Sequence, residues 1–340
     1  MTITVQRGTD QIGGTVTEIS SNSTKILIDF GSQLEGAEKK ELNIDWDSGY
    51  DAVFLTHYHG DHIGEIDQIP EDVPVYFGKT ATEMSIVLTE TLIKGKQADK
   101  KVLKKDQVLH KIQEKNHFLE QGKTLEIGDL KITPYHADHS AYDAYMLLIE
   151  CGGKRILHTG DFRLNGYTGA ETLENFQKIE KIDYLITEGT TLSRDGYVPE
   201  SEASISQKAK GYLAKHKYVF VLCSSMNIDY IASIVGALPP YMPLICDEYQ
   251  KKILVIVSNE NSEGIYNFKD KKINIIQKGG KKYEHNISKG FCMLVRAKNK
   301  KAKFTLFKNS LKNHANKPDS LLLYGLWDGC LHGKHKKTRF

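Results

Sequence analysis

The sequence has few cysteines and no long apolar run. Its five cysteines are scattered along 340 residues without a Cys-x-x-Cys pair, which argues against a disulfide framework and favours reduced thiols in a cytoplasmic protein. No apolar run approaches the roughly 18–20 residues of a membrane span, so no membrane association is predicted. Residues 1–4 lack a basic region followed by an apolar core, and no signal peptide is expected.

Charge is unevenly distributed along the chain. Residues 251–340 hold 21 Lys or Arg and 6 Asp or Glu, whereas the first 250 residues hold 25 and 37. Such a basic region favours a polyanionic partner, and a solvated lysine-rich surface is an equally good explanation on charge alone. The hydrophobic content of 40% and the length predict a soluble chain with one large or two medium domains.

A cluster of metal-ligand residues follows an apolar run. Residues 52–55 predict a buried strand, and His57, His59, Asp61 and His62 come directly after it. Ligands bind at the carboxyl ends of strands in α/β sheets, and imidazole and carboxylate groups are both ligands of zinc. His57 and His59 can face one ion while Asp61 and His62 face a second, and Gly60 allows the tight bend between them.

The segment 57–62 has the pattern His-x-His-x-Asp-His and resembles the metallo-β-lactamase superfamily. Segments 12–18 and 25–31 resemble the opening hairpin of that family, and residues 139–140 and 157–162 resemble its later metal motifs. The resemblance implies an α/β fold, the αββα sandwich. It also implies that His57, His59 and His139 bind one ion, that Asp61 and His62 bind another, and that Asp161 bridges the two. His136 is the alternative to His139.

Two metal ions imply a hydrolytic reaction. Ions roughly 3.5–4 Å apart can share a hydroxide, lower the pKa of the water that forms it, and polarise a phosphoryl or carbonyl oxygen. Two Zn²⁺ ions are predicted from the imidazole-rich set, with Mn²⁺ as the alternative. His158 is either a group that orients a metal-binding carboxylate or a half-buried histidine of a strand.

The pattern of apolar residues predicts two α/β regions. In the first region, residues 1–30 predict two strands, and residues 79–115 predict a helical segment with a solvated lysine face. Residues 183–187 predict a buried strand. Further strands are expected at 51–56, 124–133, 144–150 and 154–158. The polar stretch 193–199 is interpreted as a domain crossing. In the second region, helices at 202–216 and 228–237 alternate with strands at 218–222 and 243–247, which predicts a parallel sheet.

The second region resembles the inserted domain of the β-CASP nucleases, the superfamily branch that includes ribonuclease J and the polyadenylation endonuclease. Residues 188–191 and 219–230 carry this resemblance. It implies that Glu188 orients His62 or Asp161, and a plain strand-end carboxylate is the alternative. Ser224, Ser225 and Asn227 crowd a predicted helix N-terminus, where they either contact a substrate phosphate or simply cap the helix.

The predicted domains are 1–193, a metallo-β-lactamase domain, 200–322, a β-CASP-like α/β domain, and 323–340, a truncated return segment with a basic tail. The family's Ser-Gly-His-Ala-type element and last metal histidine are not found there, and His314, His332 and His335 lack a supporting pattern. We therefore expect weaker binding of the second ion and an exposed edge in the lactamase sheet.

Three functions are consistent with these features. The first is a metal-dependent phosphodiesterase, a ribonuclease that acts on single-stranded RNA, with DNA as the alternative substrate. The second is an inactive or truncated relative that binds nucleic acid, and the third is a metallo-hydrolase of small esters or lactones. A homo-oligomer is compatible with the sequence.

Overall fold

The computed structural model describes residues 1–34, 40–192, 196, 198–261, 263–269, 273–275, 287–296 and 312–326. Most of the lysine-rich zone, part of the expected domain crossing, and the basic tail with His332 and His335 lie outside the described residues. The chain divides into two compact units, Met1–Pro199 and Glu200–Phe340. Each unit is built around its own sheets.

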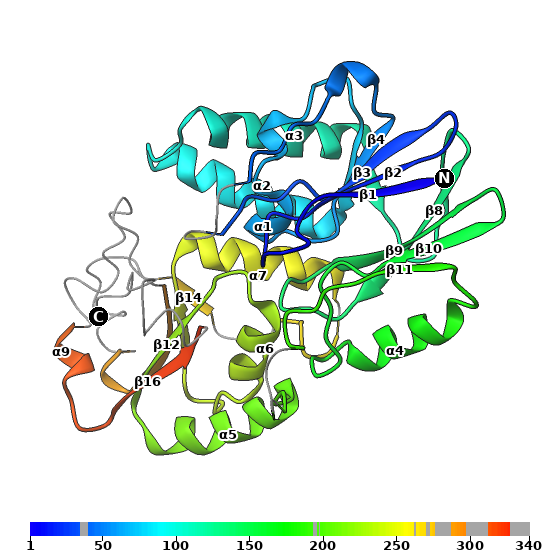
Figure 1. Ribbon diagram of the computed structural model, residues 1–340. Coiled ribbons are helices and arrows are strands. Elements are labelled where there is room, and N and C mark those ends of the chain that lie inside the picture. Colours follow the sequence, from blue (N-terminus) through cyan, green and yellow to red (C-terminus); the bar gives the residue numbers. More distant parts are fainter. Residues whose placement is uncertain are drawn as a thin grey trace. The chain divides into compact units, whose positions relative to one another are not determined.

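Unit 1 contains two sheets that lie between outer helices, with α2 (Lys79–Lys94) and α3 (Lys100–Lys115) on one side and α4 (Gly169–Lys178) on the other (Figure 1). The first sheet has the strand order β1-β2-β3-β4-β5-β6, and the second has the order β11-β10-β9-β8-β7. This is the αββα sandwich predicted from the sequence. The strands are β1 (Thr2–Arg7), β2 (Val16–Ser20), β3 (Lys25–Ile28), β4 (Ala52–Phe54), β5 (Val75–Gly78), β6 (Phe118–Leu119), β7 (Leu125–Ile127), β8 (Leu130–Ala137), β9 (Ala144–Cys151), β10 (Lys154–His158) and β11 (Tyr184–Ile186).

The core of unit 1 lies between the two sheets. Phe54 and Ile28 of the first sheet pack in one cluster with Leu147, Ile149 and Ile132 of the second, and all five are fully buried. Each such side chain contributes roughly 1.5–3 kcal/mol when it leaves water. All three residues of strand β4 are buried, and its edges pair in parallel with β3 and β5. The core therefore fixes the strand whose carboxyl end carries the histidine cluster.

Two expectations about unit 1 were wrong in detail. Residues 1–30 form three strands rather than two, because the chain turns at 21–24 and returns as β3. The helical segment 79–115 is two helices, α2 (Lys79–Lys94) and α3 (Lys100–Lys115). Gly95 ends α2, and the Asp99 side chain caps α3 by accepting a hydrogen bond from the Val102 N–H group.

Strand β11 is an edge strand rather than the buried strand predicted at 183–187. It pairs in parallel with β10 and is the last strand of its sheet in the described part of the chain. Tyr184 is 50% exposed and Leu185 is 56% exposed, although both are apolar or aromatic. The sequence pattern showed an apolar strand but could not show that nothing covers one of its sides.

Unit 2 contains a five-stranded sheet with the order β14-β13-β15-β12-β16, and every recorded pair is parallel, as predicted. Phe220, Phe291, Met293 and Ile245 form a buried cluster in this sheet. The elements are α5 (Glu202–Lys215), β12 (Tyr218–Cys223), α6 (Ile228–Gly236), β13 (Leu244–Cys246), α7 (Glu248–Glu260), β14 (Ile273–Ile275), β15 (Phe291–Val295), α9 (Lys312–Ala315) and β16 (Ser320–Gly325).

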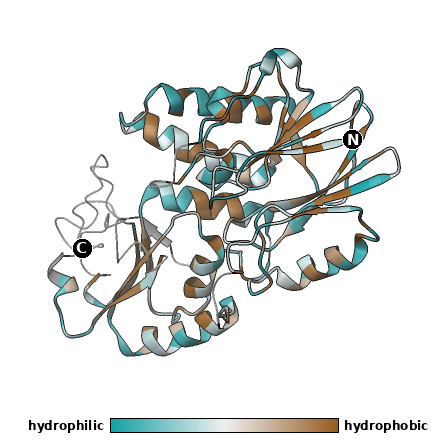
Figure 2. Cartoon of the chain, viewed as in Figure 1, coloured by the Kyte–Doolittle hydropathy of each residue, from teal (hydrophilic) through white to brown (hydrophobic). Residues whose placement is uncertain are grey.

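Hydrophobic residues gather along the strands, while the helices carry both hydrophobic and hydrophilic residues (Figure 2). This distribution is typical of helices that pack one face on a sheet and turn the other to water. Among the described residues, none of the helices combines the length and the apolar character that crossing a membrane requires.

Asp143 connects the second sheet of unit 1 to helix α2. Its backbone has the left-handed φ of 62°, and its Oδ2 accepts a hydrogen bond from the Ala81 N–H group at 3.0 Å in the first turn of the helix. A β-carbon at Gly78 would lie 2.4 Å from that oxygen, so only glycine fits there. Burial raises the pKa of Asp143 to about 6, although the Ala81 N–H group acts in the opposite direction.

We predict that Asp143→Asn changes how stability depends on pH. The folded-state pKa lies above the usual value of 3.8, so folding favours the protonated form of Asp143. Its contribution to the free energy of unfolding is complete below pH 4 and is lost as the pH rises through 6. The wild-type protein should lose up to roughly 3 kcal/mol relative to Asp143→Asn between pH 4 and pH 7.5. Chemical denaturation of both proteins measures this difference, and an offset that stays constant with pH would contradict the prediction.

Candidate metal centre

The histidine cluster lies on a loop and short helix that follow β4. The helix α1 (Gly60–Ile63) is held by the segment after β3, because Phe30 N–H donates to the His62 carbonyl at 2.7 Å. Thr15 N–H donates to the Asp61 carbonyl at 3.0 Å. A β-carbon at Gly31 would lie only 1.6 Å from that carbonyl oxygen, so this glycine permits the close approach of the two segments. The loop is therefore fixed by backbone contacts from two other strands.

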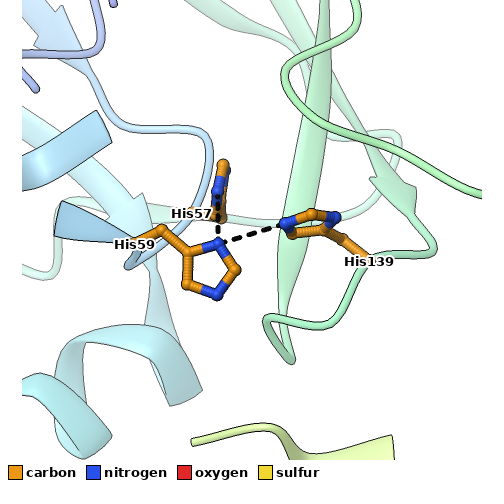
Figure 3. A group of neighbouring side chains, drawn as sticks. All are labelled: His57, His59 and His139. Atoms are coloured by element: carbon orange, nitrogen blue, oxygen red, sulfur yellow. Dashed lines mark hydrogen bonds between the residues drawn. The ribbon is translucent and has the colours of Figure 1, made fainter. Parts of the chain in front are cut away.

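Three imidazole rings converge at the end of this loop (Figure 3). His57 Nε2 and His139 Nε2 each lie 3.1 Å from His59 Nδ1. Three nitrogens bound to one tetrahedral zinc ion at about 2.0–2.1 Å would be separated by roughly 3.3 Å. Burial lowers the pKa of His57 and His59, and it lowers the pKa of His139 to about 3. The rings are therefore neutral, and their lone pairs fit a metal ion.

A second group of possible ligands adjoins the first and consists of His57, His62 and Asp161. Asp161 Oδ1 lies 3.3 Å from His62 Nε2, whereas Oδ2 lies 3.9 Å from His139 Nε2 and 4.0 Å from His57 Nε2. The two carboxylate oxygens thus face different histidines. This orientation is what a carboxylate needs to serve two ions at once.

Asp61 lies beside these groups but is not a member of either one. It lines the same cavity as His62 and Asp161. Its negative charge acts on His59, where it partly offsets the effect of burial on the pKa. The assignment of Asp61 to the second ion stays a prediction.

Asp29 is a functional residue that the sequence analysis missed. It is fully buried at the end of β3 and has a left-handed φ of 62°. Its carboxylate accepts hydrogen bonds from Thr56 N–H at 2.7 Å and from His62 Nδ1–H at 2.7 Å. Burial acts to lower the pKa of His62, but the charges of Asp29 and Asp161 outweigh it and raise that pKa well above 6.5. Asp29 thereby points His62 Nε2 toward Asp161. Its place in segment 25–31 was the only signal for it.

His158 lies at the carboxyl end of β10 and is 3% exposed. Its Nδ1 accepts a hydrogen bond from Gly160 N–H at 3.2 Å, and burial lowers its pKa to about 4. The neutral ring therefore carries its proton on Nε2, and that buried atom has no hydrogen-bond partner in the described part of the chain. His158 lines the same cavity as Asp161, so its unused donor lies beside the metal-site residues.

Glu188 does not contact His62 or Asp161 in the way that the sequence interpretation suggested. Its two carboxylate oxygens accept from Phe162 N–H at 3.4 Å and from Thr190 N–H at 3.2 Å. It therefore holds the backbone next to Asp161 rather than a ligand side chain. His136 lies outside the cluster, because its Nε2 is 3.0 Å from the Tyr145 hydroxyl and its Nδ1 faces Glu171.

Asp138, the neighbour of His139, fixes the loop that carries Asp161. This carboxylate is fully buried and accepts from Gly166 N–H at 2.7 Å and from Arg163 Nε–H at 3.3 Å. The same residue donates its own N–H to Thr172 Oγ1 at 2.6 Å. The loops that carry His139 and Asp161 are thus joined through one buried carboxylate.

The site opens into a cavity of about 660 Å³ within unit 1. Among the described lining residues, the carboxylates are Asp10, Asp61, Asp161 and Glu188. The one arginine of this lining, Arg7, is 5% exposed and paired with Glu65 at 2.8 Å. The wall is therefore acidic, and a bound cation would offset this charge.

The residues predicted to contact phosphate lie in unit 2, at the turn between β12 and α6. Asn227 caps α6 by accepting from Tyr230 N–H at 3.3 Å, and Ser224 Oγ accepts from Met226 N–H at 3.3 Å. Ser225 is 7% exposed, and its hydroxyl oxygen has no partner in the described part of the chain. Capping thus explains Asn227 but leaves the Ser225 hydroxyl unexplained.

Arg296 is a second residue that the sequence analysis missed. It follows β15 and forms an ion pair with Asp247, which follows β13, while its guanidinium lies 4.8 Å from the centre of the Tyr249 ring. Burial lowers its pKa to about 10. The signal available in the sequence was its position as the first cation directly after the apolar run 291–295.

Comparison with known proteins agrees with this geometry. A family model described as a beta-lactamase superfamily domain matches residues 24–217, more than half of the chain. The chain belongs to this superfamily.

The chain also resembles named ribonucleases and a polyadenylation factor. It is 29% identical over 185 residues to an RNase J-like protein of Methanocaldococcus jannaschii, over 54% of this chain and 41% of that protein. It is 24% identical over 245 residues to ribonuclease J of Mycoplasma genitalium, over 67% and 40%. It is 22% identical over 198 residues to cleavage and polyadenylation specificity factor subunit 3-II of Arabidopsis thaliana, over 53% and 31%. These matches agree with the β-CASP resemblance, and they span less than half the length of each relative.

A solved structure shares the fold. A protein of unknown function from Enterococcus faecalis V583 matches with a TM-score of 0.69 and 18% sequence identity, over 95% of this chain and 87% of that chain.

We predict that Asp29→Asn weakens the binding of a metal ion at the His57, His62 and Asp161 group. Asparagine keeps an acceptor for Thr56 N–H but removes the charge that orients His62, and such outer partners typically change metal affinity by about 10–100-fold. Competition with a chelator of known affinity measures the change. Glu65→Gln is the matched control, because it also removes a carboxylate from an ion pair of unit 1, and Glu65 itself neither lines the cavity nor belongs to a ligand group. Equal zinc affinity of Asp29→Asn and the wild-type protein would contradict the prediction.

Proposed function

We propose that this chain is a metal-dependent phosphodiesterase that hydrolyses single-stranded RNA with two divalent metal ions, Zn²⁺ or alternatively Mn²⁺. The observation that carries the proposal is the arrangement of Asp161, whose two oxygens face the two adjacent ligand groups. The names of the similar proteins favour RNA as the substrate. When bound, the pair of ions would activate a water molecule and polarise a phosphoryl oxygen.

In this proposal the chain's own residues have separate tasks. His57, His59 and His139 hold one ion, and His62 and Asp161 hold the other with Asp61 beside them. Asp29 keeps His62 Nδ1 occupied, so that Nε2 is left for the metal. Asp138 and Glu188 fix the backbone on which Asp161 is carried.

His158 supplies a neutral hydrogen-bond donor in the same cavity. Its Nδ1 is taken by Gly160 N–H, so only Nε2–H can act. We propose that this donor binds a carboxylate of the site when the metal-binding residues are engaged. The buried and unpartnered Nε2 supports this role, since such donors usually have a partner in the working state of a protein.

The turn at Ser224, Ser225 and Asn227 is proposed to bind a phosphate of the substrate. The N–H groups at the start of a helix favour an anion, and the Ser225 hydroxyl is buried without a partner. We predict that Ser225→Ala raises KM for an RNA oligonucleotide about ten- to 100-fold, as expected for one lost hydrogen bond to a charged group, while kcat changes little. Steady-state kinetics measure both constants. A fall in kcat with unchanged KM would contradict a binding role.

The test of the proposed function is cleavage of end-labelled single-stranded RNA by the purified chain with Zn²⁺ or Mn²⁺. We expect cleavage by the wild-type protein and at least a 100-fold loss in Asp161→Ala, because this substitution removes the carboxylate between both groups. Asp61→Ala is also expected to lose activity, because Asp61 lines the same cavity and is proposed to serve the second ion. Glu65→Gln is the control for general damage to unit 1.

The same assay separates the other functions. Hydrolysis of a small ester or lactone without cleavage of RNA would support the alternative metallo-hydrolase. Binding of RNA with no turnover, and fewer than two metal ions per chain, would support a non-catalytic relative.

A further inference from the structure

A second cavity lies in unit 2, at the amino-terminal ends of its strands. Its volume is about 290 Å³, and it is lined by residues that come just before β12, β13, β15 and β16. We call it the amino-end pocket, and its polar and aromatic lining residues are Lys215, His216, Lys217, Tyr241, Lys289 and Asp319. The turn at Ser224–Asn227 lies at the other end of β12, roughly 20 Å away for a strand of six residues.

The amino-end pocket concentrates positive charge. Three lysines line it, and Asp319 is its only carboxylate among the described lining residues. Lys317 adds a fourth ammonium group nearby, because Lys317 Nζ and Lys217 Nζ lie 4.8 Å and 5.5 Å from the centre of the same Tyr218 ring. Charges of one sign gathered in one region repel one another, and a bound anion reduces that repulsion.

Local structure explains only part of this charge. Lys215 ends α5, and a cation is favourable at the carboxyl end of a helix. Lys289 and Lys317 belong to other segments, more than 70 residues further along the chain, and the helix end does not account for them. The fold therefore brings cations from separate segments to one cavity.

An exposed aromatic ring lies beside these cations. Tyr241 is 72% exposed, whereas its neighbour Met242 is buried. The turn before it contains Pro239 and Pro240, and Met242 N–H donates to the Pro239 carbonyl at 3.0 Å, which stiffens the loop that presents the ring. Sites for single-stranded nucleic acids combine two features. Cations lie along the phosphate backbone, and an aromatic ring stacks on a base.

We propose that the amino-end pocket binds a nucleotide unit of single-stranded RNA, with its base against Tyr241 and its phosphates against Lys215, Lys217 and Lys289. The proposal rests on the proposed function for the class of substrate. It adds a contact on unit 2 that is separate from the phosphate turn at Ser224–Asn227. Long RNA should therefore bind more tightly than RNA of a few nucleotides.

The test measures the affinity of the full chain for a fluorescent single-stranded oligouridylate of about 20 nucleotides, by anisotropy at several salt concentrations. Asp161→Ala is present in every protein so that the RNA stays intact. The pocket variant combines Lys215→Gln, Lys217→Gln and Lys289→Gln. The control combines Lys100→Gln, Lys104→Gln and Lys115→Gln on α3, which removes the same charge from exposed lysines of unit 1.

We expect the pocket variant to reduce the slope of log affinity against log salt by about 2, since each phosphate contact contributes about 0.7 for a single strand. The control should keep the wild-type slope. Tyr241→Ala should weaken binding about tenfold, and Tyr241→Phe should retain it because its ring can still stack. Thermal melting of each variant shows whether it is folded.

Several outcomes would overturn the proposal. One is a pocket variant with the same slope and affinity as the α3 control. Another is displacement of the RNA by polyglutamate at equal charge together with no effect of Tyr241→Ala, which would indicate an acidic polypeptide as the partner.

Hydrolysis of bis(p-nitrophenyl) phosphate separates this proposal from the proposed function. In chains with Asp161 intact, the pocket variant should hydrolyse this small diester at the wild-type rate. If no protein cleaves diester or RNA but the pocket variant still loses RNA affinity, the pocket is supported and the proposed function is wrong. If the wild-type chain cleaves RNA and the pocket variant binds RNA like the control, only the pocket proposal is wrong.

Discussion

The buried carboxylate of Asp29 is the interaction on which the metal centre depends. It joins three elements of unit 1, since it ends β3, accepts from the backbone of Thr56 after β4, and accepts from His62 in α1. Its own N–H donates to the Phe54 carbonyl at 2.8 Å, so the residue is fixed at both backbone and side chain. The left-handed backbone at this position lets the chain leave the sheet and still return its carboxylate to the loop. An aspartate tolerates that conformation better than most residues.

The charges of Asp29 and Asp161 determine the orientation and the protonation of His62. His62 lies between Asp29 and Asp161, and the pull of two carboxylates outweighs the effect of burial on its pKa. Carboxylate oxygens lie farther from His57 and His139, at 4.0 and 3.9 Å, and burial is the largest influence that lowers the pKa of the three other histidines. The loop after β4 thus holds His62, which is oriented by anions, together with His57 and His59, whose nitrogens face each other and His139 from the loop after β8. Histidines therefore serve in both ligand groups, but only the second group contains one that is oriented by carboxylates.

The sequence predicted much of this arrangement, and the reason is that its main motif is local. His57, His59 and His62 lie within one short loop, and the apolar run before them identified the strand. Their partners were harder to find. Asp29 is 33 residues from His62, and Asp138 is 25 residues from Arg163, so both contacts depend on how the strands are ordered. Exposure of β11 and the pairing of Arg296 with Asp247 likewise depend on tertiary neighbours that periodicity does not report.

Charge is divided between the two units in a way that bears on a polyanionic substrate. The cavity beside the metal centre has carboxylates in its wall, and its arginine is already paired with Glu65. A phosphodiester would therefore be repelled there unless metal ions supplied the positive charge, so affinity at this site and catalysis depend on the same ions. The amino-end pocket has the opposite character, because lysines outnumber carboxylates among its described lining residues. If it binds RNA as proposed, its contacts do not depend on the metal. Under the proposed function, removal of metal should therefore abolish turnover of RNA while it leaves a salt-sensitive part of the binding in place.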